Sequence, residues 1–350
     1  MMEKFVRGLC EDFCPEKEVK LRVKERLLHF YELKNGQKNV AGTVVKCFSR
    51  SAAGIKRPEP KDLRTLRCLQ RTVEYLLKDI LLDKRKPFHY VYDFIFDRLR
   101  AVRQEIVMQH CDAQQTIKLV EPIILFLVYS RYILCEESRD NFDPKICDQH
   151  LQECLKRVLC CYDEIMSSHL MQSFTIRELA NRNFIESVYQ LFNLGSMEAL
   201  HRWTQLPRNI RIDPLLSASY SICISYFQGN LYRVLVGIKN LPHILCAIAS
   251  LKLQLVRRKL YEMFVHAFNN RQLSAPIDFL CRLTNYANES DIFIDCKYYN
   301  LSISDDRKRV YFIKSDFKLD SCTTKEKREY IVEEKLKCIN LPEVLLLRKL

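Results

Sequence analysis

Apolar residues recur every three or four positions through most of this chain, a spacing typical of helices that bury one face. The clearest runs predict helices over about 62–82, from near His89 to 106, and over 113–137, 145–168 and 176–193. An earlier helix should begin at Pro15, because proline suits the first helical turn, and should run to Asn35-Gly36. The pattern therefore predicts a mostly α-helical protein.

The least periodic part of the chain is residues 36–62, where Gly42, Gly54, Pro58 and Pro60 fall among basic residues. We interpret this part as an extended basic connector. Val44 to Phe48 is its only strand-like stretch.

An internal repeat lies between residues 195 and 245. Gly195 leads through an apolar stretch to Leu206-Pro207, and Gly229 leads through a similar stretch to Leu241-Pro242. The glycines are 34 positions apart and the Leu-Pro pairs 35 apart, which is the period of helical-hairpin repeats of the tetratricopeptide type. We therefore expect helix pairs that stack on one another.

The pattern changes near Pro276. Short helices at 277–283 and 289–300 are followed by two strands, 301–304 and 310–313, around a polar turn. Helix, helix, strand, turn, strand is the order of a winged helix, and residues 323–350 predict a closing helix. The predicted segments are an N-terminal helix at 1–35, the connector at 36–62, a helical-repeat domain at 63–275, a winged-helix subdomain at 276–320 and a C-terminal helix at 321–350.

Composition supports this interpretation and disfavours other classes. Only 7 residues are glycine, whereas average usage gives about 25, so turn-rich β folds and Gly-rich nucleotide loops are not expected. The most apolar stretch, 119–135, contains Glu121 and Arg131, which predicts a buried helix and no membrane association. The N-terminus shows no apolar leader and the 16 cysteines are scattered, which predicts an intracellular chain with reduced thiols.

The net charge of +13 is unevenly distributed. Residues 1–100 carry 23 basic and 14 acidic side chains, residues 101–200 carry 9 and 14, and residues 201–350 carry 24 and 15. Two basic ends flank an acidic middle. The ends could attract RNA, DNA or an acidic protein, but for the charge alone basic, solvated helix faces are the preferred interpretation.

Known catalytic signatures are missing from the sequence. It contains no Walker loop, GxGxxG, HExxH or GxSxG pattern, and its histidines fall on separate predicted helices. We therefore expect no enzyme activity, no cofactor and no small-molecule substrate. Cys10 and Cys14 resemble half of a zinc site, but a structural site needs four ligands, so apolar packing of the two thiols is the preferred interpretation.

Charged residues crowd the apolar stripe of the predicted helix at 89–106. Asp97, Arg100 and Gln104 share one face, whereas Arg98 and Arg103 flank the stripe. Charges so close to a buried face favour ion pairs within the chain that fix how helices stack.

The turn of the predicted winged helix is a candidate nucleic-acid site. Its cations are Arg307, Lys308, Arg309, Lys314 and Lys318. Five phosphate contacts would give a log–log salt dependence with a slope of roughly −4. A solvated hairpin tip is the alternative.

Several stretches, in this order, resemble motifs of the Sac-three/GANP domain family. They are Gly8-x-Cys10-x-x-Phe13-Cys14-Pro15-x-x-Glu18, Val45-Lys46-x-Phe48-Ser49-Arg50-Ser51-Ala52-Ala53-Gly54, Leu63-Arg64-Thr65-Leu66, Phe96-Asp97-Arg98-x-Arg100-Ala101-Val102-Arg103-Gln104-Glu105, Leu191-Phe192-Asn193-Leu194-Gly195 and Gly229-Asn230-Leu231-Tyr232-Arg233. Phe13 stands where the family often has Met. The resemblance, from about residue 8 to 345, marks as structural motif positions Cys10, Cys14, Pro15, Glu18, Arg50, Ser51, Arg64, Asp97, Arg98, Arg100, Arg103 and Gln104.

The resemblance implies a helical-repeat superhelix that ends in a winged helix, the PCI-type architecture. Long members of the family are mRNA-export scaffolds at nuclear pores. They pair with a PCI-domain protein and a small acidic subunit, and their joined winged helices contact nucleic acid. Because no Phe-Gly repeats precede residue 8 and the chain stops soon after the domain, it is similar to the short member linked to centrosome duplication and spindle assembly.

Two functions are therefore expected. The first is a non-catalytic scaffold for centrosomal and spindle proteins, located at the centrosome, the spindle and in the cytoplasm. The second is an RNA-binding subunit of an mRNA-export complex in the nucleus or at the nuclear pore.

Overall fold

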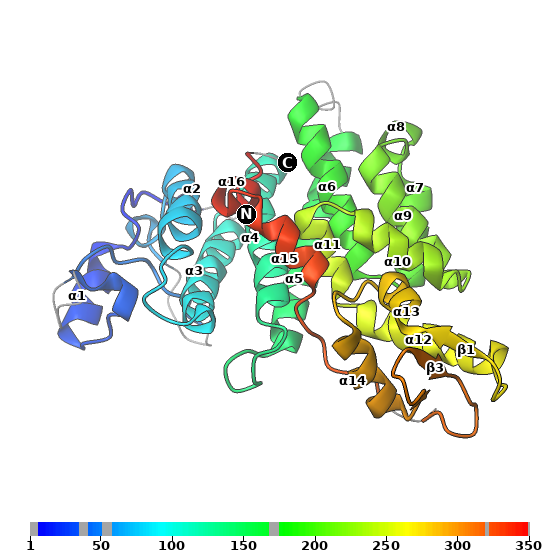
Figure 1. Cartoon of the computed structure of the whole chain (residues 1–350). Helices are drawn as coiled ribbons and strands as arrows, with labels where there is room; N and C mark the ends of the chain where they lie inside the picture. The colour runs from blue at the N-terminus through cyan, green and yellow to red at the C-terminus, as the bar shows by residue number, and fades with distance from the viewer. Residues whose placement is uncertain (1–5, 35–40, 51–57, 168–174, 319–321, 349–350) are drawn as a thin grey trace. The chain divides into compact units, whose positions relative to one another are not determined.

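The computed structural model describes residues 6–34, 41–50, 58–167, 175–318 and 322–348. Two compact units make up the chain (Figure 1). The first contains residues up to 130, 138–175 and from 340 onward, and the second contains 131–137 and 176–339. The described elements are mostly helical, with a small three-stranded antiparallel sheet near the C-terminal end, which confirms the predicted fold class.

The first unit is built from long helices and a strapped N-terminal segment. Its elements are α1 (Glu16–Lys24), the 3₁₀ turns Phe30–Glu32 and Pro60–Asp62, α2 (Leu66–Tyr75) with a π-helical extension (Leu76–Ile80), α3 (Phe88–Met108), α4 (Ala113–Ile133), α5 (Pro144–Ser167) and α16 (Leu341–Leu345). The apolar stripe of α3 is buried, and α4 is buried almost all round. Burial of these faces, rather than local propensity, stabilises such helices.

Two predicted helices of the first unit have different bounds. The helix expected to reach Asn35 ends at Lys24, where the chain turns through Arg26 with a positive φ of 57°. The helix expected from residue 62 begins at Leu66, because Thr65 is its N-cap and accepts a hydrogen bond from the N–H of Cys68. Val44 to Phe48 is extended and its first two residues are buried, although it forms no named strand.

The second unit begins with stacked helices. They are α6 (Ile176–Phe192), α7 (Met197–Gln205), α8 (Arg208–Arg211), α9 (Pro214–Phe227), α10 (Leu231–Asn240), α11 (His243–Ser250) and α12 (Leu253–Ala267). Each half of the internal repeat starts after a glycine with positive φ and ends its first helix at a Leu-Pro pair, whose proline precedes the next helix. Helix α9 packs on α6 and on α10, so consecutive pairs share their buried faces.

A small α+β module follows. Its elements are β1 (Ser274–Pro276), α13 (Ile277–Thr284), α14 (Glu289–Tyr299), β2 (Ser302–Ile303) and β3 (Arg309–Tyr311). The sheet order is β1-β3-β2, and Val310 lies opposite both Ala275 and Ile303. Together with the two helices this is a winged-helix arrangement. Its core includes Val265 and Tyr261 of α12, so the module is continuous with the helical stack.

The C-terminal part forms two short helices rather than the single predicted one. Residues 322–329 run without helix into α15 (Tyr330–Lys337), and α16 begins anew at Leu341 with Asn340 as its N-cap. The boundaries predicted for the five sequence segments stay a prediction. Within the described ranges, no helix is both long enough and apolar enough to cross a bilayer.

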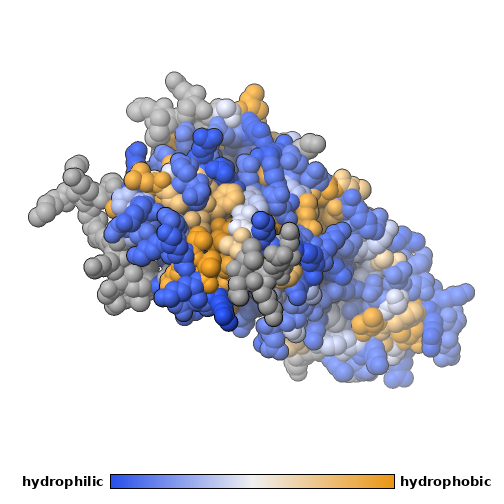
Figure 2. Space-filling view, turned by 90° about the vertical axis from the view of Figure 1, so that its left-hand side faces the viewer, coloured by the Kyte–Doolittle hydropathy of each residue, from blue (hydrophilic) through white to orange (hydrophobic). Residues whose placement is uncertain are grey.

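Surface hydrophobicity is unevenly distributed on the side of α1 to α3. Figure 2 shows apolar surface gathered in one area there, bordered by hydrophilic side chains. Exposed apolar residues of the first unit include Leu9, Leu21, Leu82 and Val107.

Candidate functional site

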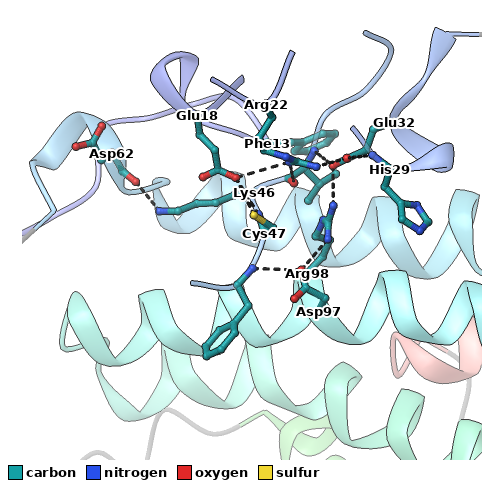
Figure 3. Close-up of polar contacts among 12 residues, drawn as sticks. Phe13, Glu18, Arg22, His29, Glu32, Lys46, Cys47, Asp62, Asp97 and Arg98 are labelled. Carbon is teal, nitrogen blue, oxygen red and sulfur yellow. Dashed lines mark hydrogen bonds and ion pairs between the residues drawn. The ribbon is translucent and has the colours of Figure 1, made fainter. Parts of the chain in front are cut away.

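A buried carboxylate, Glu32, lies where three segments of the first unit meet (Figure 3). It pairs with Arg22 of α1 and, at 3.1 Å, with Arg98 of α3. It also accepts hydrogen bonds from the backbone N–H groups of His29 at 2.9 Å and Val45 at 3.1 Å. We call these groups the Glu32 network. It ties α1 and the extended stretch before Phe48 to the middle of α3.

The electrostatics of the Glu32 network favour ionised Glu32. Burial alone would raise the pKa of Glu32, but the guanidinium groups of Arg98 and Arg22 and the two backbone donors lower it overall. The same surroundings act oppositely on His29, whose pKa is lowered to about 4 by burial and then by the positive charge of Arg98. The network therefore holds one anion, two cations and a neutral imidazole.

Further hydrogen bonds around the Glu32 network also hold neighbouring segments on α3. The carboxylate of Asp97 accepts from the backbone N–H of Phe48 at 3.2 Å and pairs with Arg98 at 2.6 Å. Glu18 of α1 accepts from the backbone N–H of Cys47 at 3.1 Å. These contacts, drawn in Figure 3, fix the extended stretch along α3.

A second buried carboxylate, Glu105, lies on α3 two turns beyond Arg98. Its oxygens accept from the backbone N–H of Arg64 at 2.7 Å and from the Arg64 side-chain Nε at 3.0 Å, and they lie 3.2 Å from the Lys46 ammonium. We call these three residues the Glu105 network. Arg64 is fully buried, so the pair is shielded from solvent. One turn on, Gln109 binds the N–H of Gly8 and the carbonyl of Arg64.

The structure thus brings together motif residues that are far apart in the sequence. Glu18, Arg64, Asp97 and Arg98 all belong to, or border, the two networks. Pro15 is the N-cap of α1, one position before the first helical residue, whereas the helix was predicted to begin at Pro15 itself. Arg50 is exposed and Ser51 lies outside the described residues.

The two motif cysteines occupy different surroundings. Cys14 is buried, and burial followed by the charge of Glu18 raises the pKa of its thiol. The Cys10 thiol donates to the carbonyl of Asp12 at 3.3 Å, and burial also raises its pKa. In the part of the chain that the structure describes, no three His, Cys, Asp or Glu side chains are grouped as metal ligands would be.

The remaining motif residues of α3 line a groove, which we call the Arg100 groove. Arg100 lies over the ring of Phe48 at 3.8 Å, Gln104 donates to the carbonyl of Ser49 at 2.7 Å, and Arg103 pairs with Glu153 of α5 at 3.0 Å. The groove has a volume of about 490 Å³.

The predicted nucleic-acid residues lie in the winged-helix module of the second unit. Arg307 and Lys308 are exposed at the tip of the β2–β3 hairpin, where Arg307 has a positive φ of 54°. Arg309 is also exposed, but its guanidinium donates to the hydroxyl and carbonyl of Ser274, at 2.6 and 2.9 Å, and so joins β3 to β1. Lys314 and Lys318 are exposed beyond β3.

The aromatic side chains of the winged-helix module differ in exposure. Tyr299 is buried against Tyr261 and Phe317, whereas Tyr298 of α14 and Phe279 of α13 are exposed.

Ionisable groups also converge inside the second unit. Arg257 forms two hydrogen bonds with Glu329, at 2.6 and 2.9 Å, and Asp295 accepts from the hydroxyls of Tyr261 and Tyr286. All five residues are buried and bonded to one another or to neighbouring backbone groups. They hold the segment before α15 on α12, which is a structural task.

Sequence reasoning missed the two carboxylates that organise the first unit. Glu105 falls inside a recognised motif and could have been singled out there. Glu32 has no local signal, because its partners come from residues 22, 45 and 98.

The fold and the candidate sites define a class of protein: a helical-repeat chain with buried ion networks and a winged-helix module. The sequence profile of the SAC3/GANP family matches residues 13–305. The chain therefore belongs to the SAC3/GANP family.

Several relatives extend this finding. Protein xmas of Drosophila melanogaster is 25% identical over 330 residues, which cover 89% of this chain and 16% of the relative. SAC3 family protein 1 of Schizosaccharomyces pombe is 22% identical over 319 residues, 85% of this chain and 30% of the relative. SAC3 family protein B of Arabidopsis thaliana is 35% identical over 151 residues, 41% of this chain and 8% of the relative. The chain spans less than a third of the length of each.

Proposed function

We propose that this chain is a non-catalytic scaffold that assembles protein partners and RNA in a complex of the mRNA-export type. The observation that carries the proposal is the SAC3/GANP match over residues 13–305, within which the motif residues Arg64 and Arg98 form buried ion pairs. Such networks hold segments in place, which is what a scaffold needs. Its proposed partners are a PCI-domain protein and a small acidic subunit, in the nucleus or at the nuclear pore.

The winged-helix tip supports the RNA part of the proposal. Arg307 and Lys308 project from a hairpin whose turn is fixed by Asp306, which accepts from the hydroxyl of Ser304 at 2.5 Å and from the N–H of Lys308 at 3.1 Å. A rigid tip with two exposed cations is suited to contact a phosphate backbone.

The centrosomal scaffold remains a second candidate. It was suggested by the length of the chain and by resemblance to a short family member. Because the chain spans only part of its relatives, length does not distinguish the two functions.

Affinity purification of the tagged chain from dividing cells tests the scaffold proposal. We expect a PCI-domain protein and a small acidic protein to co-purify and to remain bound after nuclease treatment. Recovery of centrosomal and spindle proteins without either of those two would instead favour the centrosomal scaffold. Recovery of neither set would contradict the scaffold proposal.

The RNA part is tested on the purified chain with the double variant Arg307→Glu/Lys308→Glu. Arg309 is left in place because it joins β3 to β1. Removing two phosphate contacts should weaken binding to single-stranded RNA about tenfold or more at low salt, and should reduce the steepness of the salt dependence by about 1.4. The control Lys239→Glu/Lys337→Glu makes the same charge change at exposed positions outside the module. Equal weakening by both variants would mean that net charge, and not the tip, attracts RNA.

A further inference from the structure

The Arg100 groove is a candidate binding surface that the proposed function does not explain. It is lined by residues of α3, α4 and α5 and by Phe48, all within the first unit. Its volume of about 490 Å³ is that of a ligand site rather than of a packing defect.

Positive charge is in excess along this groove. Arg100, Arg103 and Arg157 line it, and Glu153 is the only carboxylate among the lining residues. Glu153 pairs with Arg103, whose Nη1 also lies 2.9 Å from His150 Nδ1. Over the ranges that the structure describes, neither Arg100 nor Arg157 pairs with a carboxylate.

Arg100 is held in position without being neutralised. Its guanidinium lies 3.8 Å from the centre of the Phe48 ring, and the backbone of Phe48 is itself bonded to Asp97. Stacking on an aromatic ring orients the planar guanidinium group of an arginine. The N–H groups at the edge of that plane can then still donate to a carboxylate. The groove therefore presents a preorganised donor.

The floor of the groove is apolar. Ile106, Val107, Met108 and Val120 line it; Ile106 and Val120 are buried, whereas Val107 is 65% exposed. An exposed valine on an apolar floor beside cations matches a peptide that carries both an apolar anchor and carboxylates. A phosphate backbone would use the arginines but not the floor.

We propose that the Arg100 groove docks an acidic segment of a partner protein, with one apolar side chain on the Val107 floor and flanking carboxylates on Arg100 and Arg157. This inference rests on the proposed scaffold function and names the chemistry of one of its partners.

A random library of displayed 12-residue peptides, selected on the immobilised full chain, provides the probe. We expect the recovered peptides to combine Asp or Glu with a large apolar residue. Fluorescein-labelled synthetic copies should bind Arg100→Glu/Arg157→Glu at least tenfold more weakly than the wild type, with the difference shrinking at high salt. Val107→Ser, which keeps the arginines, should weaken binding several-fold at any salt concentration.

The control is Arg67→Glu, which changes an exposed arginine of α2 that does not line the groove. Circular dichroism and thermal melts confirm that every variant is folded. Recovered peptides without acidic residues, or peptides that bind the double variant as well as the wild type, would overturn the proposal. So would a 20-nucleotide oligouridylate that lost affinity in the double variant while no acidic peptide bound.

The peptide titration and the purification from cells can fail separately. The titration uses the purified chain alone, so it does not depend on which complex the chain joins. If the variant Arg100→Glu/Arg157→Glu loses peptide binding but still co-purifies with the PCI-domain protein, the partner that docks its acidic segment in the groove is a different protein from the PCI-domain subunit.

Discussion

His29 is an unusual residue at the edge of the Glu32 network, since it stays neutral beside two guanidinium groups. Its Nδ1 accepts from the N–H of Tyr31 at 3.3 Å, and its ring stacks with Tyr90 and Phe94. Protonation would remove that acceptor and place a cation beside Arg98. This explains physically why burial and then Arg98 lower its pKa to about 4.

The lowered pKa of His29 predicts a pH dependence of stability. The unfolded chain would take up a proton near pH 6.5 and the folded chain only near pH 4, so the free energy of unfolding should fall as pH decreases across that window. Burial also lowers the pKa values of His150 and His243, so the whole chain should show this trend.

The variant His29→Asn isolates the contribution of His29. Asparagine keeps an acceptor for the N–H of Tyr31 but does not titrate, so the variant should lose stability less steeply between pH 6.5 and 4.5. Urea unfolding across this range measures the two slopes. Identical slopes for wild type and variant would show that folding does not lower the pKa of His29.

At the residue scale, sequence reasoning found the motif arginines but not their partners. Arg98 and Arg103 were expected to pair within the chain, and both do. Their acceptors, Glu32 and Glu153, lie 66 and 50 positions away along the chain. A local pattern shows that a charge lies near a core, but which carboxylate enters that core depends on tertiary packing.

At the scale of elements, the two repeat glycines have the same left-handed backbone after a helix but different steric surroundings. Gly195 follows α6 with φ +94° and Gly229 follows α9 with φ +71°. A Cβ atom on Gly195 would lie 3.1 Å from the ring of Tyr226, whereas one on Gly229 would meet nothing within 4 Å. Alanine substitution at Gly195 and at Gly229 therefore compares backbone strain with a steric contact and backbone strain without one.

We predict that Gly195→Ala destabilises the chain more than Gly229→Ala. The left-handed backbone costs an alanine roughly 1–2 kcal/mol at either position, and Gly195→Ala should add about 1 kcal/mol from the contact with Tyr226. Urea denaturation of both variants, repeated in a Tyr226→Ala background, measures the two contributions. If the difference between the glycine variants persisted without the Tyr226 ring, the steric explanation would be wrong.

Element prediction succeeded where the apolar period was long and failed where short turns intervened. The helices α3 to α6 lie close to their predicted ranges, and the winged-helix order was recognised from its short strands. The predicted helices at the two ends were too long, because Arg26 adopts a left-handed backbone and Asn340 starts a separate helix. A single residue in the left-handed region can end a helix, and an N-cap residue can start a new one, without breaking the apolar period around them.

At the scale of the whole molecule, each unit has its own buried ion network. In the first, Glu32 binds Arg22 and Arg98. In the second, Glu329 binds both terminal nitrogens of Arg257, and its N–H donates to the hydroxyl of Tyr132 at 2.8 Å. The two carboxylates resemble each other in burial and in pairing with arginine, so the same substitution can be made in each unit.

We predict that Glu32→Gln and Glu329→Gln each loosen only their own unit. Losing the carboxylate charge leaves buried guanidinium groups uncompensated, which should cost about 3 kcal/mol of local stability. Hydrogen exchange read by mass spectrometry should speed up in α1 to α3 for Glu32→Gln and in α12 to α14 for Glu329→Gln. Glu16→Gln, which removes an exposed pair with Lys20, should leave exchange beyond α1 unchanged. If either buried substitution accelerated exchange equally in both units, the chain would open as a single cooperative body, and the two networks would not be separate supports of the scaffold.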